Sequence, residues 1–228
     1  MYRVNKINEL NDIIIPHFNN YPLISNKYND FNLWSKVIIK MLQKEHLDKT
    51  GFATILSLYG SINRGISSNI LRLFPNIIAE KKVSSSLPKY LNPYWVSGFV
   101  AGDGSFVLGI RKKKEGTNRF GLYWNFTVTQ HSKDLELMKL LKSFFNCGYI
   151  AVRSNEKTLR CDFWVQDINS IIIKIIPHFE KYTLQNIKQL DFLGFKIVLD
   201  LVSNKKHSLK ENQILIQNII NRMNLRKK

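Results

Sequence analysis

The sequence lacks the features that define several large classes of protein. It contains two cysteines, Cys147 and Cys161, in 228 residues, which excludes a disulfide framework and fits buried thiols in a reducing compartment. No apolar run reaches the roughly 18 residues of a membrane span. Lys174 interrupts the longest candidate, Ile168 to Ile176, and the N-terminus has no apolar segment typical of a signal peptide. We therefore expect neither a membrane partner nor export.

Acidic residues are scarce as well. Lys and Arg number 34 against 17 Asp and Glu, which gives a formal net charge of +17 and a pI near 9.9. A chain this basic is expected to bind a polyanion, and nucleic acid comes before a membrane surface. Hydrophobic residues make up 44% of the chain and aromatic residues 12%, which is enough for a packed core and excludes general disorder.

Fingerprints of common cofactor sites are also missing. No His and Cys residues have the spacing of a zinc site. Gly102-Asp103-Gly104 follows a predicted helix rather than a strand, so it is not a phosphate-binding loop. His17 and His178 both follow a proline at the end of an apolar helix, and this recurrence favours structural roles for them.

Three residue types are over-represented. Together 27 Ile, 25 Lys and 23 Asn account for 75 of the 228 residues. All three have A/T-rich codons, so an A/T-rich gene is expected. Organellar genomes are one source of such genes, and low-GC bacteria are another.

The chain repeats itself at a fixed offset. Ile14 to Tyr21 recurs as Ile175 to Tyr182, 161 residues later, and 16 of the 50 residues from 14 to 63 are identical to their counterparts. This is far more than unrelated segments share, so the chain contains a duplication. The first copy begins at Met1, which is equivalent to residue 162 of the second, so one and a half repeats are expected. The predicted parts are the helical C-terminal half of a first repeat (1–63), a connector (64–91) and a complete second repeat (92–228).

The second copy alternates helices and strands. Asn92 and Pro93 suit the N-cap and first position of a helix that ends near Gly104. Alternating and β-branched residues predict strands at 105–112 and 119–130, and Ser132 is expected to cap the next helix. The order α-β-β-α-β-β-α with tail helices places the chain in the α+β class. The remaining elements expected are strands at 149–153 and 159–165, helices at 167–176, 185–203 and 208–225, and first-copy helices at 6–15, 24–42 and 48–60.

Two glycines lie one turn apart in the predicted helix at 92–104. Glycine inside a helix costs about 1 kcal/mol relative to alanine. Close approach of another helix backbone would offset this cost, although a fraying helix end is an alternative. The predicted helix interface consists of Ser97, Gly98, Ala101 and Gly102.

Asp103 stands at the C-terminal end of this helix. The helix dipole is negative there, so a carboxylate is disfavoured unless a cation approaches. Mg²⁺ needs one or two carboxylates together with waters and phosphate oxygens. Asp103 is therefore predicted to bind a divalent metal, with a turn-forming aspartate as the alternative.

The segment from Trp95 to Phe106 resembles the signature of the LAGLIDADG homing endonucleases. The order of elements and the Ile-Pro-His-Phe segment with Tyr182, Lys188 and Asp191 are similar to that family too. The resemblance covers nearly the whole chain. It implies the LAGLIDADG homing-endonuclease fold, in which paired signature helices cross and each αββαββα repeat lays a four-stranded antiparallel saddle sheet in a DNA major groove.

The resemblance also implies the chemistry. Asp103 matches the metal-binding acid whose metal supports attack of water on the phosphodiester, and Lys188 and Lys27 match the family's buried lysine near the active site. Ala101 departs from the family pattern, because many members have an acid there. The first copy has no signature helix, so an upstream or separately encoded half-repeat is expected to supply the second carboxylate of a two-metal site.

Charge and strand alternation predict the DNA-facing surface. Residues 105–160 hold 11 Lys and Arg against four acids. Arginine and amide side chains can read base edges, whereas lysines mostly neutralise phosphates. The predicted DNA contacts are Ser105, Val107, Gly109, Arg111, Lys113, Arg119, Tyr123, Asn125, Thr127, Arg153 and Arg160.

Three functions remain open on the sequence. The first is a Mg²⁺-dependent, site-specific endonuclease of double-stranded DNA, encoded in an organellar intron and located in the mitochondrion or, alternatively, the chloroplast. The second is a maturase that binds intron RNA on the same fold. The third is a catalytically inactive DNA-binding remnant.

Overall fold

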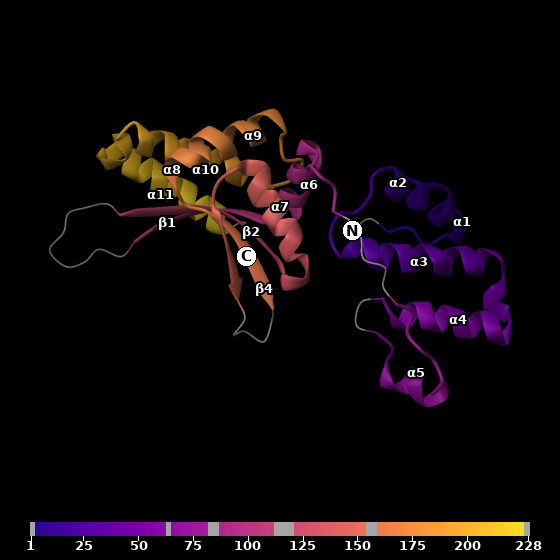
Figure 1. The fold of residues 1–228 in the computed structure, drawn as a ribbon. Coiled ribbons are helices and arrows are strands. Elements are labelled where there is room, and N and C mark those ends of the chain that lie inside the picture. The colour runs from indigo at the N-terminus through magenta and orange to yellow at the C-terminus, as the bar shows by residue number, and fades with distance from the viewer. Residues whose placement is uncertain (1–2, 63–64, 82–86, 112–120, 154–158, 226–228) are drawn as a thin grey trace. The chain divides into compact units, whose positions relative to one another are not determined.

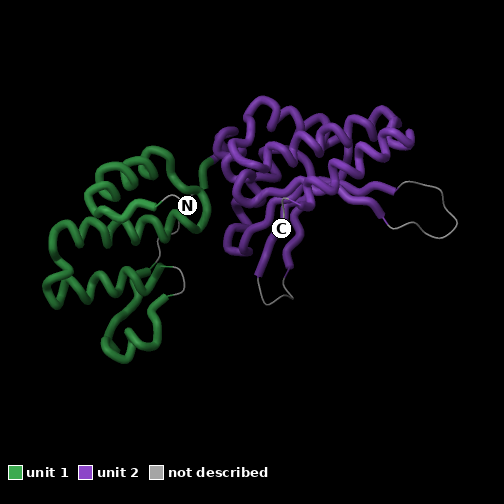
Figure 2. The backbone as a smooth tube through the Cα atoms, turned by 180° about the vertical axis from the view of Figure 1, so that it is seen from behind, with its two compact units in different colours: residues 1–88 green, residues 89–228 purple. Residues whose placement is uncertain are grey.

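The computed structural model describes residues 3–62, 65–81, 87–111, 121–153 and 159–225. The chain separates into two compact units, unit 1 from Met1 to Pro88 and unit 2 from Lys89 to Lys228 (Figure 2). In the described residues, no helix is both long enough and apolar enough to cross a membrane.

Unit 1 is helical (Figure 1). Its helices α3 and α4 pack against each other, and both have apolar residues at helical spacing, such as Leu33 and Ile38 on α3, that are buried. The predicted first-copy helices are all present. The bounds are α1 (Ile7–Glu9), a π-helical turn (Leu10–Ile14), α2 (Ile15–Asn20), α3 (Lys27–Leu42), α4 (Lys49–Gly60) and α5 (Ser68–Leu73).

A proline explains why α1 and α2 are joined by a π-helical turn. Pro16 lies in the first turn of α2, and proline can neither donate the backbone hydrogen bond nor accommodate the carbonyl four residues earlier. Widening the preceding turn relieves that clash. The same arrangement recurs at Ile171–Ile175 before Pro177. The sequence analysis did not foresee these wide turns.

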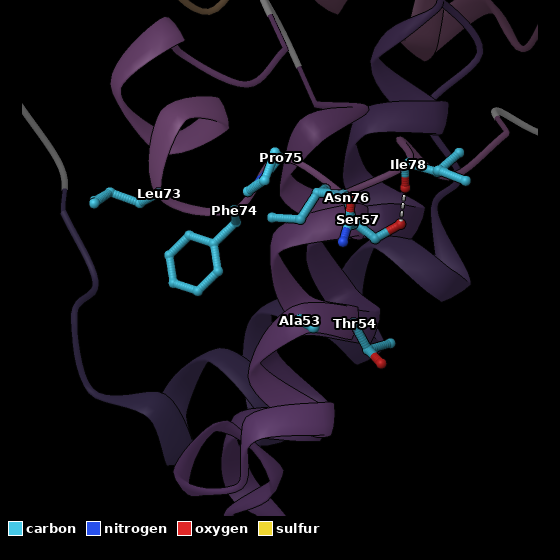
Figure 3. A pocket seen from close by; sticks show the side chains of 9 residues that line it. Ala53, Thr54, Ser57, Leu73, Phe74, Pro75, Asn76 and Ile78 are labelled. Carbon is cyan, nitrogen blue, oxygen red and sulfur yellow. Dashed lines mark hydrogen bonds between the residues drawn. The ribbon is translucent and has the colours of Figure 1, made fainter.

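Residues 65–81, predicted as a connector, fold back onto α4. The backbone N–H of Glu80 donates to the Ser57 carbonyl at 3.1 Å, and the Ser57 hydroxyl donates to the Ile78 carbonyl (Figure 3). The rings of Phe52 and Phe74 lie 5.7 Å apart. This segment is therefore part of unit 1 rather than a bare linker.

The folded-back segment and α4 border an open hollow of about 520 Å³ (Figure 3). None of the side chains around it titrates, so it offers no group for acid–base or metal chemistry. Its lining residues are Ala53, Thr54, Ser57, Leu73, Phe74, Pro75, Asn76, Ile77 and Ile78.

Unit 2 has the predicted order of elements. One detail is wrong: the His131 side chain, not Ser132, caps the turn before α7 by accepting a hydrogen bond from the Lys133 N–H. The bounds are α6 (Pro93–Asp103), β1 (Gly104–Ile110), β2 (Leu122–His131), α7 (Leu135–Phe145), β3 (Tyr149–Arg153), β4 (Arg160–Val165), α8 (Ile168–Ser170), α9 (Ile176–Lys181), α10 (Lys188–Ser203) and α11 (Lys210–Leu225).

The four strands form one antiparallel sheet in the order β1-β2-β4-β3. Helices α7, α9 and α10 pack against one face, where Phe106, Phe126 and Phe163 from the sheet meet Phe179 and Phe192 from the helices (Figure 1). All five phenylalanines are at most 1% exposed. We call the opposite face, formed by the alternate residues of each strand, the outer face.

The helices of unit 1 recur in unit 2 at the offset of 161 residues found in the sequence. Lys44 and Lys205, each after the long helix, both take a left-handed backbone conformation, with φ of 62° and 57°. The duplication therefore extends to the backbone. The paired starts are Leu10 and Ile171 for the π-helical turns, Lys27 and Lys188 for α3 and α10, and Lys49 and Lys210 for α4 and α11.

Candidate nucleic-acid interface and metal centre

Helix α6 positions the candidate site. Asn92 caps it by accepting hydrogen bonds from the backbone N–H groups of Tyr94 at 2.8 Å and Trp95 at 3.4 Å. Val96 and Val100 are fully buried and attach the helix to unit 2. Because both ends of α6 are fixed in this way, the residues that follow Val100 have a defined place at the edge of the sheet.

One of the predicted helix-interface residues faces inward. Ser97 is 5% exposed, donates to the Tyr182 carbonyl at 2.6 Å and lies 3.3 Å from Nε2 of His178. The expectation that Ser97 meets another helix at an open interface is therefore wrong. Its hydroxyl instead ties α6 to the end of α9. Burial lowers the pKa of His178 to about 4, so this histidine is neutral near pH 7.

The other face of α6 is open. A Cβ added at Gly98 or Gly102 would meet no atom within 4 Å, and Ala101 is half-buried. Trp95 and Phe99 stack beside these glycines with ring centroids 4.7 Å apart. No described element packs on this glycine face, so the predicted contact with a second helix stays a prediction.

The C-terminal end of α6 is held by two side chains at the start of α10, about 85 residues further along the chain. Lys188 Nζ donates to the carbonyl oxygens of Val100 at 3.0 Å and Gly102 at 3.1 Å. The Asn186 amide donates to the Ala101 carbonyl at 2.8 Å. The Val100 carbonyl also accepts the N–H of Gly104, whereas the carbonyls of Ala101 and Gly102 are among the last of the helix and have no partner within it. A cation at this end also complements the helix dipole.

Asp103 lies beside this lysine. Its side chain is exposed and accepts a hydrogen bond of 2.6 Å from Nε2 of Gln130, at the end of β2. Burial lowers the pKa of Lys188, and attraction to Asp103 opposes that shift. The site therefore brings together an exposed carboxylate, a half-buried ammonium group and a side-chain amide.

Sequence reasoning counted Gln130 only among the amides of the basic surface. Its position follows from the register, because Gly104 pairs with Val128 and Gln130 therefore reaches the foot of α6. A correct register between β1 and β2 would have revealed it, but the alternation of residues along a strand fixes a face, not a register.

The donor set suits a hard divalent cation. In the described part of the chain no three His, Cys, Asp or Glu residues are grouped as metal ligands. Asp103 is exposed, and its neighbouring carbonyls already have partners, so it is the available oxygen ligand. Mg²⁺ accepts this arrangement because it takes one or two carboxylates and completes its shell with waters and phosphate oxygens.

The register confirms the predicted outer face at β1 and β2. Ser105 pairs with Thr127, Val107 with Asn125, and Gly109 with Tyr123. Gly109 itself is buried, and the Tyr123 ring lies so close that a Cβ added at Gly109 would be 2.2 Å from it. Tyr123 therefore covers Gly109 on the outer face, and the contact of Gly109 with DNA stays a prediction.

Several polar atoms on the outer face have no partner among the described residues. Asn125 Oδ1, Thr127 Oγ1 and Trp164 Nε1 are all buried without a hydrogen bond. Unpaired buried polar atoms are costly, so these atoms fit contacts that form when a ligand binds. Trp164 was missed by the sequence analysis, as was Tyr149, whose ring stacks against it at 6.5 Å.

The predicted arginines also lie on or beside this face. Arg153 and Arg160 pair across β3 and β4, and Arg111 is exposed directly after β1. Lys113 and Arg119 fall in 112–120, outside the described residues.

Lys27 occupies a different setting from Lys188. It is exposed at the start of α3, and its ammonium group has no hydrogen-bond partner among the described residues. The two lysines share their place in the duplication, and within unit 2 Lys188 lies beside Asp103 at the end of α6.

Unit 2 thus joins a four-stranded antiparallel sheet, with arginines on its outer face, to a helix that ends in a carboxylate at the edge of the sheet. A family model described as LAGLIDADG endonuclease matches residues 1–38 and 96–199. The chain belongs to the LAGLIDADG endonuclease family, and the predicted α+β homing-endonuclease fold is confirmed.

Three relatives show the extent of the likeness. "Probable intron-encoded endonuclease 2" of Neurospora crassa is 39% identical over 218 residues, which cover 90% of this chain and 46% of that protein. The I-LtrWI LAGLIDADG homing endonuclease bound to target DNA has a TM-score of 0.90 and 33% identity, over 96% of this chain and 73% of that one. I-SmaMI bound to uncleaved DNA target with calcium ions has a TM-score of 0.92 and 33% identity, over 98% and 75%. The chain thus spans less than half of the fungal relative.

Proposed function

We propose that this protein is a site-specific endonuclease that hydrolyses double-stranded DNA in a metal-dependent reaction. The exposed Asp103 carboxylate, placed between Lys188 and Gln130 at the edge of a basic sheet face, carries the proposal. The solved relatives bound to DNA support the choice of DNA as the substrate.

Magnesium is the proposed metal, and Asp103 is the residue that would hold it. A divalent cation would supply charge neutralisation and an activated water at the phosphodiester. The relative solved with calcium ions and uncleaved DNA supports a divalent-cation site.

The neighbouring side chains would prepare the site for the phosphate. Gln130 fixes the orientation of the Asp103 carboxylate through its hydrogen bond of 2.6 Å. Lys188 keeps a positive charge beside the position of the scissile phosphate, and preorganised charge of this kind stabilises a transition state in which negative charge develops. The outer-face side chains of β1 to β4 would bind the DNA and set the position of the cleaved bond.

A second half-site is part of the proposal. The described residues contain one carboxylate at the foot of one glycine-faced helix, and cleavage of both strands needs two such centres. An upstream or separately encoded half-repeat would pack its helix on Gly98 and Gly102, whose surface is open. It would also bring a catalytic carboxylate to Lys27.

The proposed origin is an organellar intron, with the mitochondrion as the location. The abundance of Ile, Asn and Lys and the intron-encoded fungal relative support it. Nothing in the described residues favours intron RNA as the partner over DNA, so the maturase and remnant hypotheses are second to the nuclease.

The proposal is tested by incubating the protein with duplex DNA that spans the uninterrupted insertion site of its intron. Cleavage at one position in Mg²⁺, binding without cleavage in Ca²⁺, and no cleavage in EDTA are the expected results. A scrambled duplex of the same composition serves as the control. Absence of Mg²⁺-dependent cleavage with the half-repeat restored would contradict the proposal.

A further inference from the structure

A buried carboxylate lies on the outer face, where it is least expected. Asp162 on β4 is 2% exposed and pairs in register with Thr129 of β2 and Ala151 of β3. Removing a carboxylate from water is unfavourable unless it is paired and hydrogen-bonded, and on a DNA-binding face it also repels phosphates. Its presence therefore requires a specific partner.

Two neighbouring side chains supply that partnership. The Thr129 hydroxyl donates to Asp162 Oδ1 at 2.5 Å, and Arg153 Nε lies 2.8 Å from Oδ2. The Asp162 side chain is 3% exposed, whereas the Arg153 side chain is 40% exposed. The carboxylate is thus the buried member of the ion pair, and the guanidinium group is the member that reaches solvent.

This ion pair holds the guanidinium group beside the carboxylate. A guanidinium has five N–H donors in a rigid fork, and its Nε lies 2.8 Å from Asp162 Oδ2. Arg153 also stands opposite Arg160, and a carboxylate two residues from Arg160 on the same strand reduces the repulsion of like charges paired across strands. An oriented arginine in the major groove suits guanine, whose O6 and N7 accept two hydrogen bonds side by side.

We infer that Asp162 is a positioning residue that makes Arg153 read a guanine at one position of the DNA target. The inference rests on the proposed function, because it requires the outer face to bind double-stranded DNA. Thr129 extends the arrangement toward the candidate metal site, since its neighbour Gln130 donates to Asp103. The guanine is therefore expected close to the cleaved phosphodiester rather than at the far end of the target.

The test selects sequences from a randomised double-stranded DNA library in Ca²⁺, using the whole chain. The wild-type protein should enrich a guanine at one position. Asp162→Asn keeps the shape but removes the charge, and the preference for that guanine should fall by roughly 5- to 150-fold while other positions keep theirs. Arg153→Lys keeps the positive charge but loses the fork of N–H donors. It should also weaken the preference for guanine at that position.

Two further variants separate positioning from folding. Thr129→Val should weaken the preference for the same guanine by a smaller factor, because it removes one hydrogen bond of the Asp162 carboxylate. Glu136→Gln breaks an exposed ion pair with Lys139 on α7 and should leave every preference unchanged. Thermal unfolding of each variant shows whether it is folded.

The outcomes are distinguishable. If Asp162→Asn folds and retains the guanine preference, or weakens all positions equally, the inference is overturned and Asp162 is a structural ion pair. If Asp162→Asn does not fold, Thr129→Val decides, and an unchanged guanine preference in that variant overturns the inference. If the wild-type protein enriches no sequence, the proposed function fails and the inference fails with it.

Discussion

The two copies of the helical segment share sequence and backbone but differ in burial. Six positions that are at most 1% exposed in unit 2 are only half-buried in unit 1. The fully buried residues of unit 2 and their unit 1 counterparts are Ile171 and Leu10, Ile175 and Ile14, Phe179 and Phe18, Phe192 and Phe31, Phe195 and Trp34, and Val198 and Val37.

The sheet accounts for the difference. Phe106 of β1 lies 5.5 Å from the rings of Phe179 and Phe192 and 5.4 Å from that of Phe195. Among the described residues of unit 1 there is no strand to supply such a ring. The comparison teaches that the duplicated sequence is sufficient to form the helices, whereas the sheet completes their core.

The largest expected effect concerns this core. Phe179→Ala should lower the free energy of unfolding of unit 2 by about 3–5 kcal/mol, because it leaves a cavity among fully buried rings. Phe18→Ala, at the equivalent position, should cost about 1 kcal/mol, because Phe18 is half-buried.

Urea unfolding followed separately in each unit checks this pair. Trp34 is the tryptophan of unit 1, whereas Trp95, Trp124 and Trp164 report on unit 2. Equal losses for the two alanine variants would show that the core of unit 1 is as complete as that of unit 2.

The second prediction concerns the two equivalent lysines. Lys188→Met should slow single-strand nicking by about 100-fold, the size expected when one preorganised charge is lost. Lys27→Met should leave nicking at the Asp103 centre unchanged, because Lys27 is proposed to serve the carboxylate of the second half-site. A strand-resolved nicking assay measures both, and an equal loss in the two variants would break the proposed difference between the copies.

The third prediction is a pH dependence carried by one histidine. Burial lowers the pKa of His178 to about 4, so the unfolded chain binds its proton more readily between pH 6.5 and 4. The stability of unit 2 should therefore fall as the pH is lowered through this window and level off below it. The slope should stay below about 1.4 kcal/mol per pH unit, the limit for one proton, because the ring is partly exposed.

A matched pair of variants isolates this effect. His178→Asn should remove the slope between pH 6.5 and 4, whereas His17→Asn, at the exposed equivalent position, should leave it. Urea unfolding at several pH values measures the slopes. An unchanged slope in His178→Asn would assign the pH dependence to other groups.

The smallest expected effect concerns helix capping. Asp48 caps α4 by accepting hydrogen bonds from the N–H groups of Thr50 at 3.0 Å and Gly51 at 3.3 Å. Its equivalent before α11 is Leu209, which is 51% exposed and cannot accept a hydrogen bond. Leu209→Asp should raise the unfolding free energy of unit 2 by up to about 1 kcal/mol. Thermal unfolding measures it, and no gain would show that α11 is capped by other groups.

The element order could be predicted because each element carries a local signal. The N-cap and proline at Asn92 and Pro93 locate α6 to within one residue, and the alternation after Ser105 identifies the outer face of β1. The duplication locates the helices that follow β4 twice over, since each of them is present in both copies.

The features that the sequence did not predict depend on contacts between distant residues, which local sequence patterns do not contain. The inward turn of Ser97 is decided by His178 and Tyr182, more than 80 residues away in the chain. The cover over Gly109 is the ring of Tyr123 on the neighbouring strand. Asp162 was passed over because only the register shows that it lies beneath Arg153.

Part of the candidate site could be predicted from local sequence, and part depends on the pairing of the strands. Asp103 is identifiable because a carboxylate at the negative end of a helix conflicts with the helix dipole. Gln130, which orients that carboxylate, has no such local signal, and its role emerges when β2 is placed beside β1.

The proposed function depends most on one claim, that the Asp103 carboxylate takes part in catalysis and does not merely stabilise the fold. The measurement that tests this most directly is single-turnover cleavage of the target duplex by Asp103→Asn in Mg²⁺, with DNA binding measured in parallel in Ca²⁺. The account predicts cleavage slower by at least about 100-fold with binding retained. Cleavage at the wild-type rate, or a loss of binding that equals the loss of cleavage, would contradict it.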